Sequence, residues 1–145
     1  KQSSIKFLTA KDIEKFKKIE LIKPYLEHRE KNIIEYNTKN NIDKSILING
    51  RNQTNQGAYK KYIDAYLSKN PAINKDMFLM VRYLAPTEYG IPVEVYCFSK
   101  DKEWINYEHI QADIFDHLLS ATTYFDLQVY ENLSGKDFSN YNKVN

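Results

Sequence analysis

The stretch that most constrains the fold runs from residue 77 to residue 119. It holds two short apolar segments separated by a turn with Pro86 and Gly90, and then an amphipathic segment. Apolar segments around a proline and a glycine are typical of a β-hairpin, and a 3.6-residue apolar period is typical of a helix. We therefore predict strands over residues 77–85 and 92–98 and a helix over residues 106–124, capped by Asn106.

Side chains in a strand alternate between its two faces, so the two predicted strands present two different surfaces. One set is mostly aliphatic and suits a face covered by helices: Leu79, Val81, Tyr83, Val93, Val95 and Cys97. The other set is aromatic with one arginine and one glutamate, and includes Phe78, Arg82, Glu94 and Tyr96. We predict that this second set lies on an open sheet face and contacts another protein surface.

The remaining segments have patterns of their own. Residues 54–69 have the apolar spacing of a helix that Thr54 caps and that ends before Pro71. Residues 11–41 have helical periodicity in two pieces, with Pro24 in the first turn of the second piece. Short apolar segments predict further strands over residues 3–8, 45–50 and 127–130.

From residue 45 onward the predicted order is strand, helix, strand, strand, helix, strand. This order predicts an α+β fold, namely a ferredoxin-like βαββαβ two-layer sandwich with both helices on one face of the sheet. A short strand and a helical arm precede it. The predicted parts of the chain are 1–10 (the short strand), 11–41 (the helical arm), 42–134 (the ferredoxin-like domain) and 135–145 (a polar tail).

Charge and composition limit the kinds of partner that we expect the chain to bind. The chain has 145 residues and a net charge of +2, with 16 Lys/Arg and 8 Asp/Glu in residues 1–75, and 5 and 11 in residues 76–145. Halves of opposite charge suit association between identical copies. Aromatic side chains on an open sheet face also stack bases in RNA-recognition modules, but an acidic half argues against a nucleic-acid partner. No apolar run is long enough to predict a membrane span.

One predicted helix face carries groups that bind metals. His109, Asp113, Asp116 and His117 recur at one-turn spacing, and imidazole and carboxylate groups so placed can chelate a divalent ion. The solvated side of an amphipathic helix has the same appearance, which is the favoured interpretation. We therefore predict no metal here and place Asp113, Asp116 and His117 in a contact surface. The sequence has no nucleophile–base pair and no glycine-rich phosphate loop, so neither catalysis nor a cofactor is expected.

Four pieces of the sequence together resemble a known family. They are Ser4-Ile5-Lys6-Phe7-Leu8; Ile48-Asn49-Gly50-Arg51 with Thr54-Asn55; Met80-Val81-Arg82 with Gly90-Ile91-Pro92-Val93-Glu94-Val95-Tyr96; and Ala112-Asp113-Ile114-Phe115-Asp116-His117-Leu118. The last two pieces are the longest and most specific. The chain resembles the cytoplasmic C-terminal region of bacterial small-conductance mechanosensitive channels, in the miniconductance branch. Residues 1–10 would then be the end of the family's central β-domain.

The resemblance implies a homo-oligomeric ion channel, heptameric in the family, that opens under membrane tension during osmotic downshock. It implies that this chain is a piece of such a protein, walling the vestibule on the cytoplasmic side of the cell membrane. Its partners would be identical subunits, with no small-molecule substrate and with membrane contact only through N-terminal parts outside this sequence. A ferredoxin-like small-molecule sensor and a metal-dependent enzyme built on the last helix are the alternatives.

Overall fold

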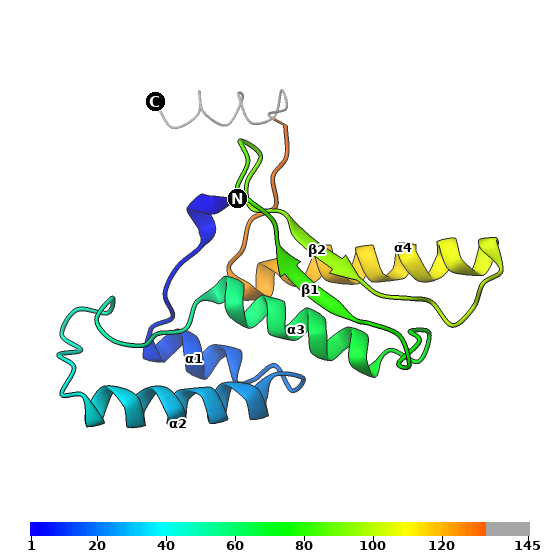
Figure 1. The fold of residues 1–145 in the computed structure, drawn as a ribbon. Helices are drawn as coiled ribbons and strands as arrows, with labels where there is room; N and C mark the ends of the chain where they lie inside the picture. Colours follow the sequence, from blue (N-terminus) through cyan, green and yellow to red (C-terminus); the bar gives the residue numbers. More distant parts are fainter. Residues whose placement is uncertain (133–145) are drawn as a thin grey trace.

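The computed structural model describes residues 1–132 (Figure 1). Its helices are α1 (Ala10–Phe16), α2 (Lys23–Lys39), α3 (Asn55–Lys69) and α4 (Trp104–Ala121), with 3₁₀ helices η1 (Gln2–Ser4) and η2 (Thr122–Phe125). Its strands are β1 (Met80–Tyr83) and β2 (Val93–Tyr96). The mixture of helices with an antiparallel sheet confirms the α+β class. The predicted polar tail, residues 135–145, lies outside the described residues.

The hairpin is formed as predicted, with shorter strands. β1 and β2 pair antiparallel, and Val81 lies opposite Val95 while Arg82 lies opposite Glu94. Residues directly opposite each other in an antiparallel pair point to the same side of the sheet. The valine side packs toward α3, where Val81 is buried, and the side with Arg82 and Glu94 is open. The predicted division of the strands into a core face and an open face is therefore confirmed.

The helical arm is also formed as predicted. α1 begins with a capping box, in which the Thr9 side chain accepts from the Asp12 N–H and the Asp12 carboxylate accepts from the Thr9 N–H. Pro24 lies in the first turn of α2, where its missing N–H leaves no helical hydrogen bond unmade. α1 and α2 run side by side below α3 (Figure 1).

The observed boundaries of α3 match the predicted ones better than those of α4 do. α3 is capped by Thr54, whose side chain accepts from the Gly57 N–H, and it ends at Lys69 as predicted. α4 begins earlier than predicted, because Glu103 is its N-cap residue. The prediction of Asn106 as the cap is wrong: its amide lies inside the first turns and donates to the Asp101 carboxylate over 2.8 Å.

The apolar stripe of α4 is only partly buried. Leu118 is buried and Ile114 half-buried, but Phe115 and Leu119 are 59% and 52% exposed. The helical period of residues 106–124 predicts a buried stripe of Ile110, Ile114, Phe115, Leu118 and Leu119, and this prediction is wrong for Phe115 and Leu119. The physical reason is the width of the sheet, because two strands do not extend over all of α4.

Three of the predicted strands are absent from residues 1–132. Residues 45–50 form turns, and Ile46 and Ile48 are 61% and 64% exposed. Residues 127–130 follow η2 without a strand, and the Gln128 N–H donates to the Ser4 hydroxyl. Residues 3–8 contain the end of η1 and an isolated bridge from Phe7 to Thr54 in place of a strand. The ferredoxin-like arrangement is thus not confirmed.

The core is centred on Phe125. Its ring lies 5.3 Å, between centroids, from the rings of Phe16, Tyr59 and Tyr62. These aromatic residues come from α1 and α3, so η2 at the end of α4 connects the arm to the sheet-covering helices. Beside this cluster, Asn55 is fully buried and binds three backbone groups, two from the N-terminal segment at Ser4 and Lys6 and one from Phe125 in η2. The core therefore forms where segments distant in sequence converge.

The α1 capping box predicts a pH dependence of stability. The Thr9 N–H lowers the pKa of Asp12 from 3.8 to about 2, with further contributions from the Thr9 hydroxyl and Lys6. A carboxylate whose pKa is depressed on folding stabilises the fold above its unfolded pKa and loses this contribution as the pH falls through the folded pKa. The difference in unfolding free energy between the parent chain and Asp12→Asn should therefore shrink between about pH 5 and pH 2. Urea titrations across that range would contradict the assignment if the difference stayed constant.

Candidate functional site

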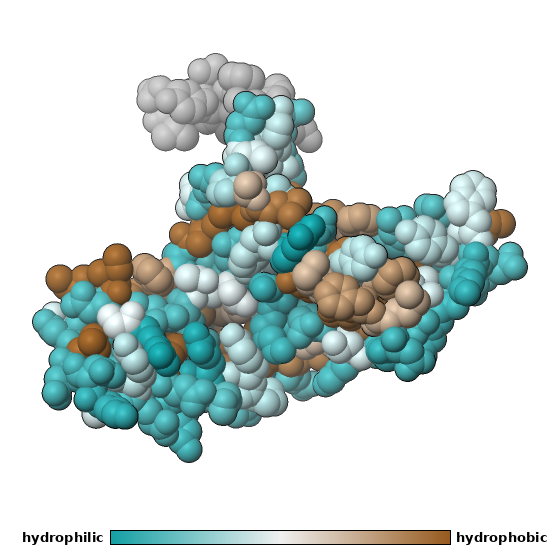
Figure 2. Space-filling model, viewed as in Figure 1, coloured by the Kyte–Doolittle hydropathy of each residue, from teal (hydrophilic) through white to brown (hydrophobic). Residues whose placement is uncertain are grey.

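The open face of the hairpin is an aromatic patch. Phe78 and Tyr96 are 62% and 47% exposed, and their ring centroids lie 6.0 Å apart. Phe98 meets the Tyr96 ring edge-on at 5.3 Å. Figure 2 shows this apolar surface over the hairpin, bordered by hydrophilic residues. The three rings form a continuous surface with no chain segment above it in the described residues, and we name Phe78, Tyr96 and Phe98 the aromatic face.

A charged pair lies next to the aromatic face. The Arg82 guanidinium donates to the Glu94 carboxylate across the two strands, at the register position where the backbones also pair. This hydrogen bond raises the pKa of Arg82. Both side chains are substantially exposed, so the pair adds little to stability and leaves the patch nearly neutral in charge. A nearly neutral aromatic surface is suited to another protein surface.

His117 packs between α4 and α3. Its Nε2 lies 2.7 Å from the Tyr62 hydroxyl, and its ring stacks on Tyr66 with 4.0 Å between centroids and 5° between planes. Both tyrosines belong to α3, so His117 connects α4 to α3. Burial raises the pKa of Tyr62 and of Tyr66, which keeps both phenols protonated.

The structure separates the other predicted α4 residues from the aromatic face. Asp113 and Asp116 are exposed on α4, and Asp113 lies near Tyr66, whose pKa it helps to raise. Phe78, Arg82, Glu94 and Tyr96 gather on the sheet face that points away from the helices. Of the seven residues predicted to form contacts, four therefore lie on the open sheet face and two lie on the exposed side of α4. The seventh, His117, lies between α4 and α3.

The groups in the described residues that could bind a metal or act as a nucleophile are few and poorly placed. No three His, Cys, Asp or Glu side chains in residues 1–132 gather closely enough to hold a metal ion. Cys97 is half-buried on the core side of the hairpin, and burial raises the pKa of its thiol. A thiol that ionises less readily is a poorer nucleophile.

A groove that no sequence pattern predicted lies beside β2. It has a volume of about 400 Å³ and lies between β2 on one side and residues 127–130 on the other, over a floor from α3 and α4. The apolar side chains that line it include Ile63, Val93, Val95, Phe115 and Leu119. We name this space the β2 groove. The alternating pattern of β2 showed which side chains face the core but carried no information about what lies beside the strand.

Comparison with protein-family models and with solved structures finds nothing similar to the chain. None of the helices in residues 1–132 combines the length and the apolar character needed to cross a bilayer.

Proposed function

We propose that this chain is the vestibule domain of a bacterial mechanosensitive ion channel that opens under membrane tension during osmotic downshock. It lies on the cytoplasmic side of the membrane and has a structural and assembly role without catalysis. Its partners are identical subunits, in a heptamer if the resemblance in the hairpin and the last helix holds for assembly as well. The full protein contains the pore, and this chain contributes to the wall below it.

The observation that carries the proposal is the aromatic face. The hairpin places three rings outward on the side of the sheet that no helix of residues 1–132 covers, and two of them, Phe78 and Tyr96, are well exposed. Large exposed apolar patches on soluble domains mark sites of association. A vestibule wall needs such a surface, because each subunit must contact its neighbours.

The charge distribution supports the same proposal. Residues 1–75 carry an excess of basic side chains and residues 76–145 an excess of acidic ones. In a ring each subunit meets its two neighbours through different surfaces, and opposite charge on those surfaces favours that head-to-tail contact. The fold that suits this role is a complete ferredoxin-like domain, of which the hairpin, α3 and α4 would be parts.

The proposal predicts a large effect of a charge in the aromatic face. In a full-length channel, Tyr96→Asp should weaken subunit association by about tenfold or more, since a carboxylate would lose its hydration in the contact. We expect less crosslinked oligomer and lower survival after osmotic downshock. The two measurements test assembly and channel activity separately.

Tyr124→Asp is the matched control. Tyr124 is 69% exposed and lies in η2, away from the aromatic face, so the same substitution there should leave the crosslinked oligomer and survival unchanged. If Tyr96→Asp behaved like this control in both assays, the aromatic face would be ordinary solvent-exposed surface and the assembly role would fail.

A further inference from the structure

Three consecutive large apolar side chains are exposed in the loop between α2 and α3. They are Ile46, Leu47 and Ile48, and we name them the apolar tip. The loop lies at the far end of the helical arm, on the left of Figure 1, and Figure 2 shows hydrophobic residues gathered at the same end. Ile34 of α2 is exposed as well and lines the same hollow as Leu47, so the apolar surface continues onto the helix. A run of exposed apolar residues in a polar loop marks a contact surface.

The backbone carbonyls of the apolar tip are bonded within the loop. The Ile46 carbonyl accepts from the Asn49 N–H over 3.1 Å. The Ile48 carbonyl accepts from the Asn52 side-chain amide over 3.2 Å. A strand that paired with this segment would need these carbonyls as acceptors, and they are already in use. The backbone of the tip is therefore poorly suited to a partner that binds by strand pairing.

Lys44 satisfies the other carbonyls of this segment. Its ammonium group donates to the carbonyls of Leu47 and Asn49 and to the side-chain oxygen of Asn52. Each carbonyl from residue 46 to residue 49 thus accepts a hydrogen bond from inside the loop. Carbonyls that are bonded internally can leave water at low cost, which is what a chain segment needs before it enters a hydrocarbon environment.

The base of the loop is attached firmly to α2. The buried Asn37 side chain accepts from the Arg51 N–H over 2.9 Å and donates to the Arg51 carbonyl over 3.2 Å. Gly50 has a φ of +68°, and a Cβ at this position would overlap the Asn37 side chain. Glycine is therefore required where the loop returns to the helix. The apolar tip is held outward by contacts at its base and needs no partner to take this shape.

The charges around the apolar tip are mainly positive. Residues 39–51 contain three basic side chains and one acidic side chain, all exposed: Lys39, Lys44, Arg51 and Asp43. The same sign prevails over residues 1–75, where basic side chains outnumber acidic ones by 16 to 8. Anionic headgroups of a lipid bilayer complement this charge, and the hydrocarbon below them complements the apolar side chains.

A second exposed apolar pair has the opposite surroundings. Trp104 and Ile105 are exposed at the start of α4, at the other end of the molecule. Residues 100–108 contain three acidic and two basic side chains. Exposed apolar residues therefore occur at both ends, but only those of the arm have the charge that suits an anionic surface.

We propose that the apolar tip inserts into the surface of a bilayer that contains anionic lipid, with the cations of Lys39 and Arg51 beside the lipid phosphates. Apolar side chains with basic neighbours are the composition of segments that lie at a bilayer surface without crossing it. This inference goes beyond the proposed function, which gives the chain no membrane contact of its own. It concerns the chain alone, so its test needs no channel.

Cosedimentation with vesicles measures the binding. Phosphatidylcholine vesicles with about 30% phosphatidylglycerol should bind the chain at least about tenfold more tightly than pure phosphatidylcholine, and added salt should reduce the difference. Ile46→Ser with Ile48→Ser should weaken binding at least about tenfold, because both isoleucines would leave water on insertion. Trp104→Ser with Ile105→Ser removes an exposed pair from the other end and should leave binding unchanged.

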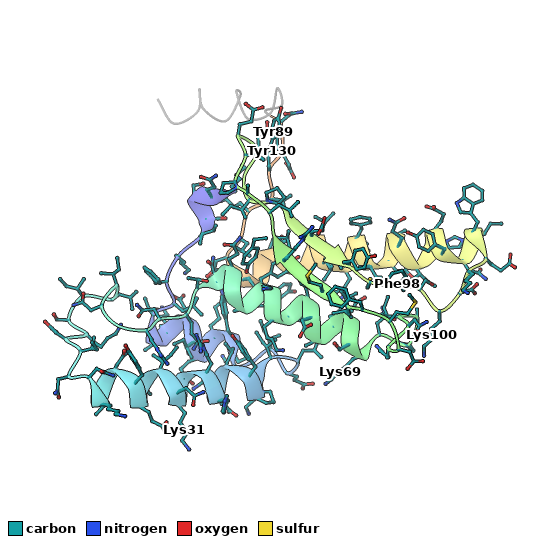
Figure 3. The ribbon with its side chains drawn as sticks, in the orientation of Figure 1. Lys31, Lys69, Tyr89, Phe98, Lys100 and Tyr130 are labelled. Carbon is teal, nitrogen blue, oxygen red and sulfur yellow. The ribbon has the colours of Figure 1, made fainter. Side chains whose placement is uncertain are left out.

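Two lysines form a matched pair for the charge contribution. Lys39 and Lys69 are both exposed in the last turn of a helix, but Lys69 lies at the end of α3 far from the loop (Figure 3). Lys39→Gln should weaken binding to the anionic vesicles about fivefold, and Lys69→Gln by less than about twofold. All the substituted side chains are exposed, so each variant should keep the Tm of the parent chain within about 2 °C.

Tryptophan fluorescence tests insertion directly. Trp104 is the only tryptophan of the chain, so it reports on the end that is expected to stay in water. Lipids with brominated acyl chains should leave its fluorescence unquenched when the parent chain binds vesicles. With Ile48→Trp in a Trp104→Phe chain, the same lipids should quench the fluorescence, and its emission should shift to shorter wavelength.

Two outcomes would overturn the proposal. Vesicle binding that Ile46→Ser with Ile48→Ser leaves unchanged would mean that the chain adsorbs by charge alone and that the apolar tip stays in water. Self-association without vesicles that the same substitutions abolish would assign the tip to a second copy of the chain. Neither outcome bears on channel activity, which the survival assay of the Tyr96→Asp channel tests separately.

Discussion

Replacing Phe125 by alanine is expected to lower the free energy of unfolding by about 3–5 kcal/mol. Phe125 is 1% exposed and touches aromatic rings from α1 and α3, so its loss leaves a cavity between three segments. The rings of Phe16 and Tyr59 are themselves held by surrounding core residues and cannot move far to fill the space. Urea denaturation followed by circular dichroism measures the change.

The neighbouring residue provides a matched control. Tyr124 precedes Phe125 in η2 and is 69% exposed, so Tyr124→Ala should change the unfolding free energy by no more than about 0.5 kcal/mol. Similar losses in the two variants would mean that η2 does not pack into the core as described.

The second large effect is expected at Asn55. Its side-chain oxygen accepts from the Lys6 N–H over 2.9 Å, and its amide nitrogen donates to the carbonyls of Ser4 and Phe125 over 2.8 and 3.1 Å. Asn55→Leu keeps the volume and removes all three hydrogen bonds, leaving buried backbone groups unpaired. We expect a loss of about 2–4 kcal/mol in the free energy of unfolding.

An asparagine that is only half-buried and whose side-chain partner lies in its own helix tests this explanation. Asn32 lies on α2 and its side chain interacts with His28, four residues earlier in the same helix. Asn32→Leu should therefore change stability by no more than about 0.5 kcal/mol. Should Asn55→Leu be equally mild, the N-terminal segment and η2 would not be joined through this side chain.

Sequence reasoning succeeded where the structure depends on residues close together in the chain. The Thr54 cap and the ending before Pro71 defined α3, because caps and proline act within one helical turn. The alternation in residues 78–98 sorted the hairpin side chains correctly, because a strand has a fixed two-residue period. Asn106 was misassigned as a cap because the N-cap residue of α4 is Glu103, whose side chain makes no capping hydrogen bond, and capping preferences carry no signal for such a start.

Residues whose roles depend on distant segments were not predictable in the same way. His117 has the spacing of a polar helix face, yet in the fold it binds Tyr62 of α3, 55 residues earlier. Asn55 looks like an ordinary residue at a helix start, and only the convergence of the N-terminal segment and η2 gives it three backbone partners. A one-dimensional pattern carries no signal for such convergence.

The sequence by itself determined the helical arm, α3, the hairpin and the two faces of the hairpin, because local periodicity, caps and turns fix each of them. Tertiary structure decided whether an apolar segment becomes a strand. Residues 45–50 and 127–130 have strand-like composition, but a strand needs a neighbour whose backbone it can pair with, and neither segment has one in residues 1–132. The same requirement leaves one edge of β2 without a partner strand in the described part of the chain. Backbone pairing is a property of two segments, and no single segment can specify it.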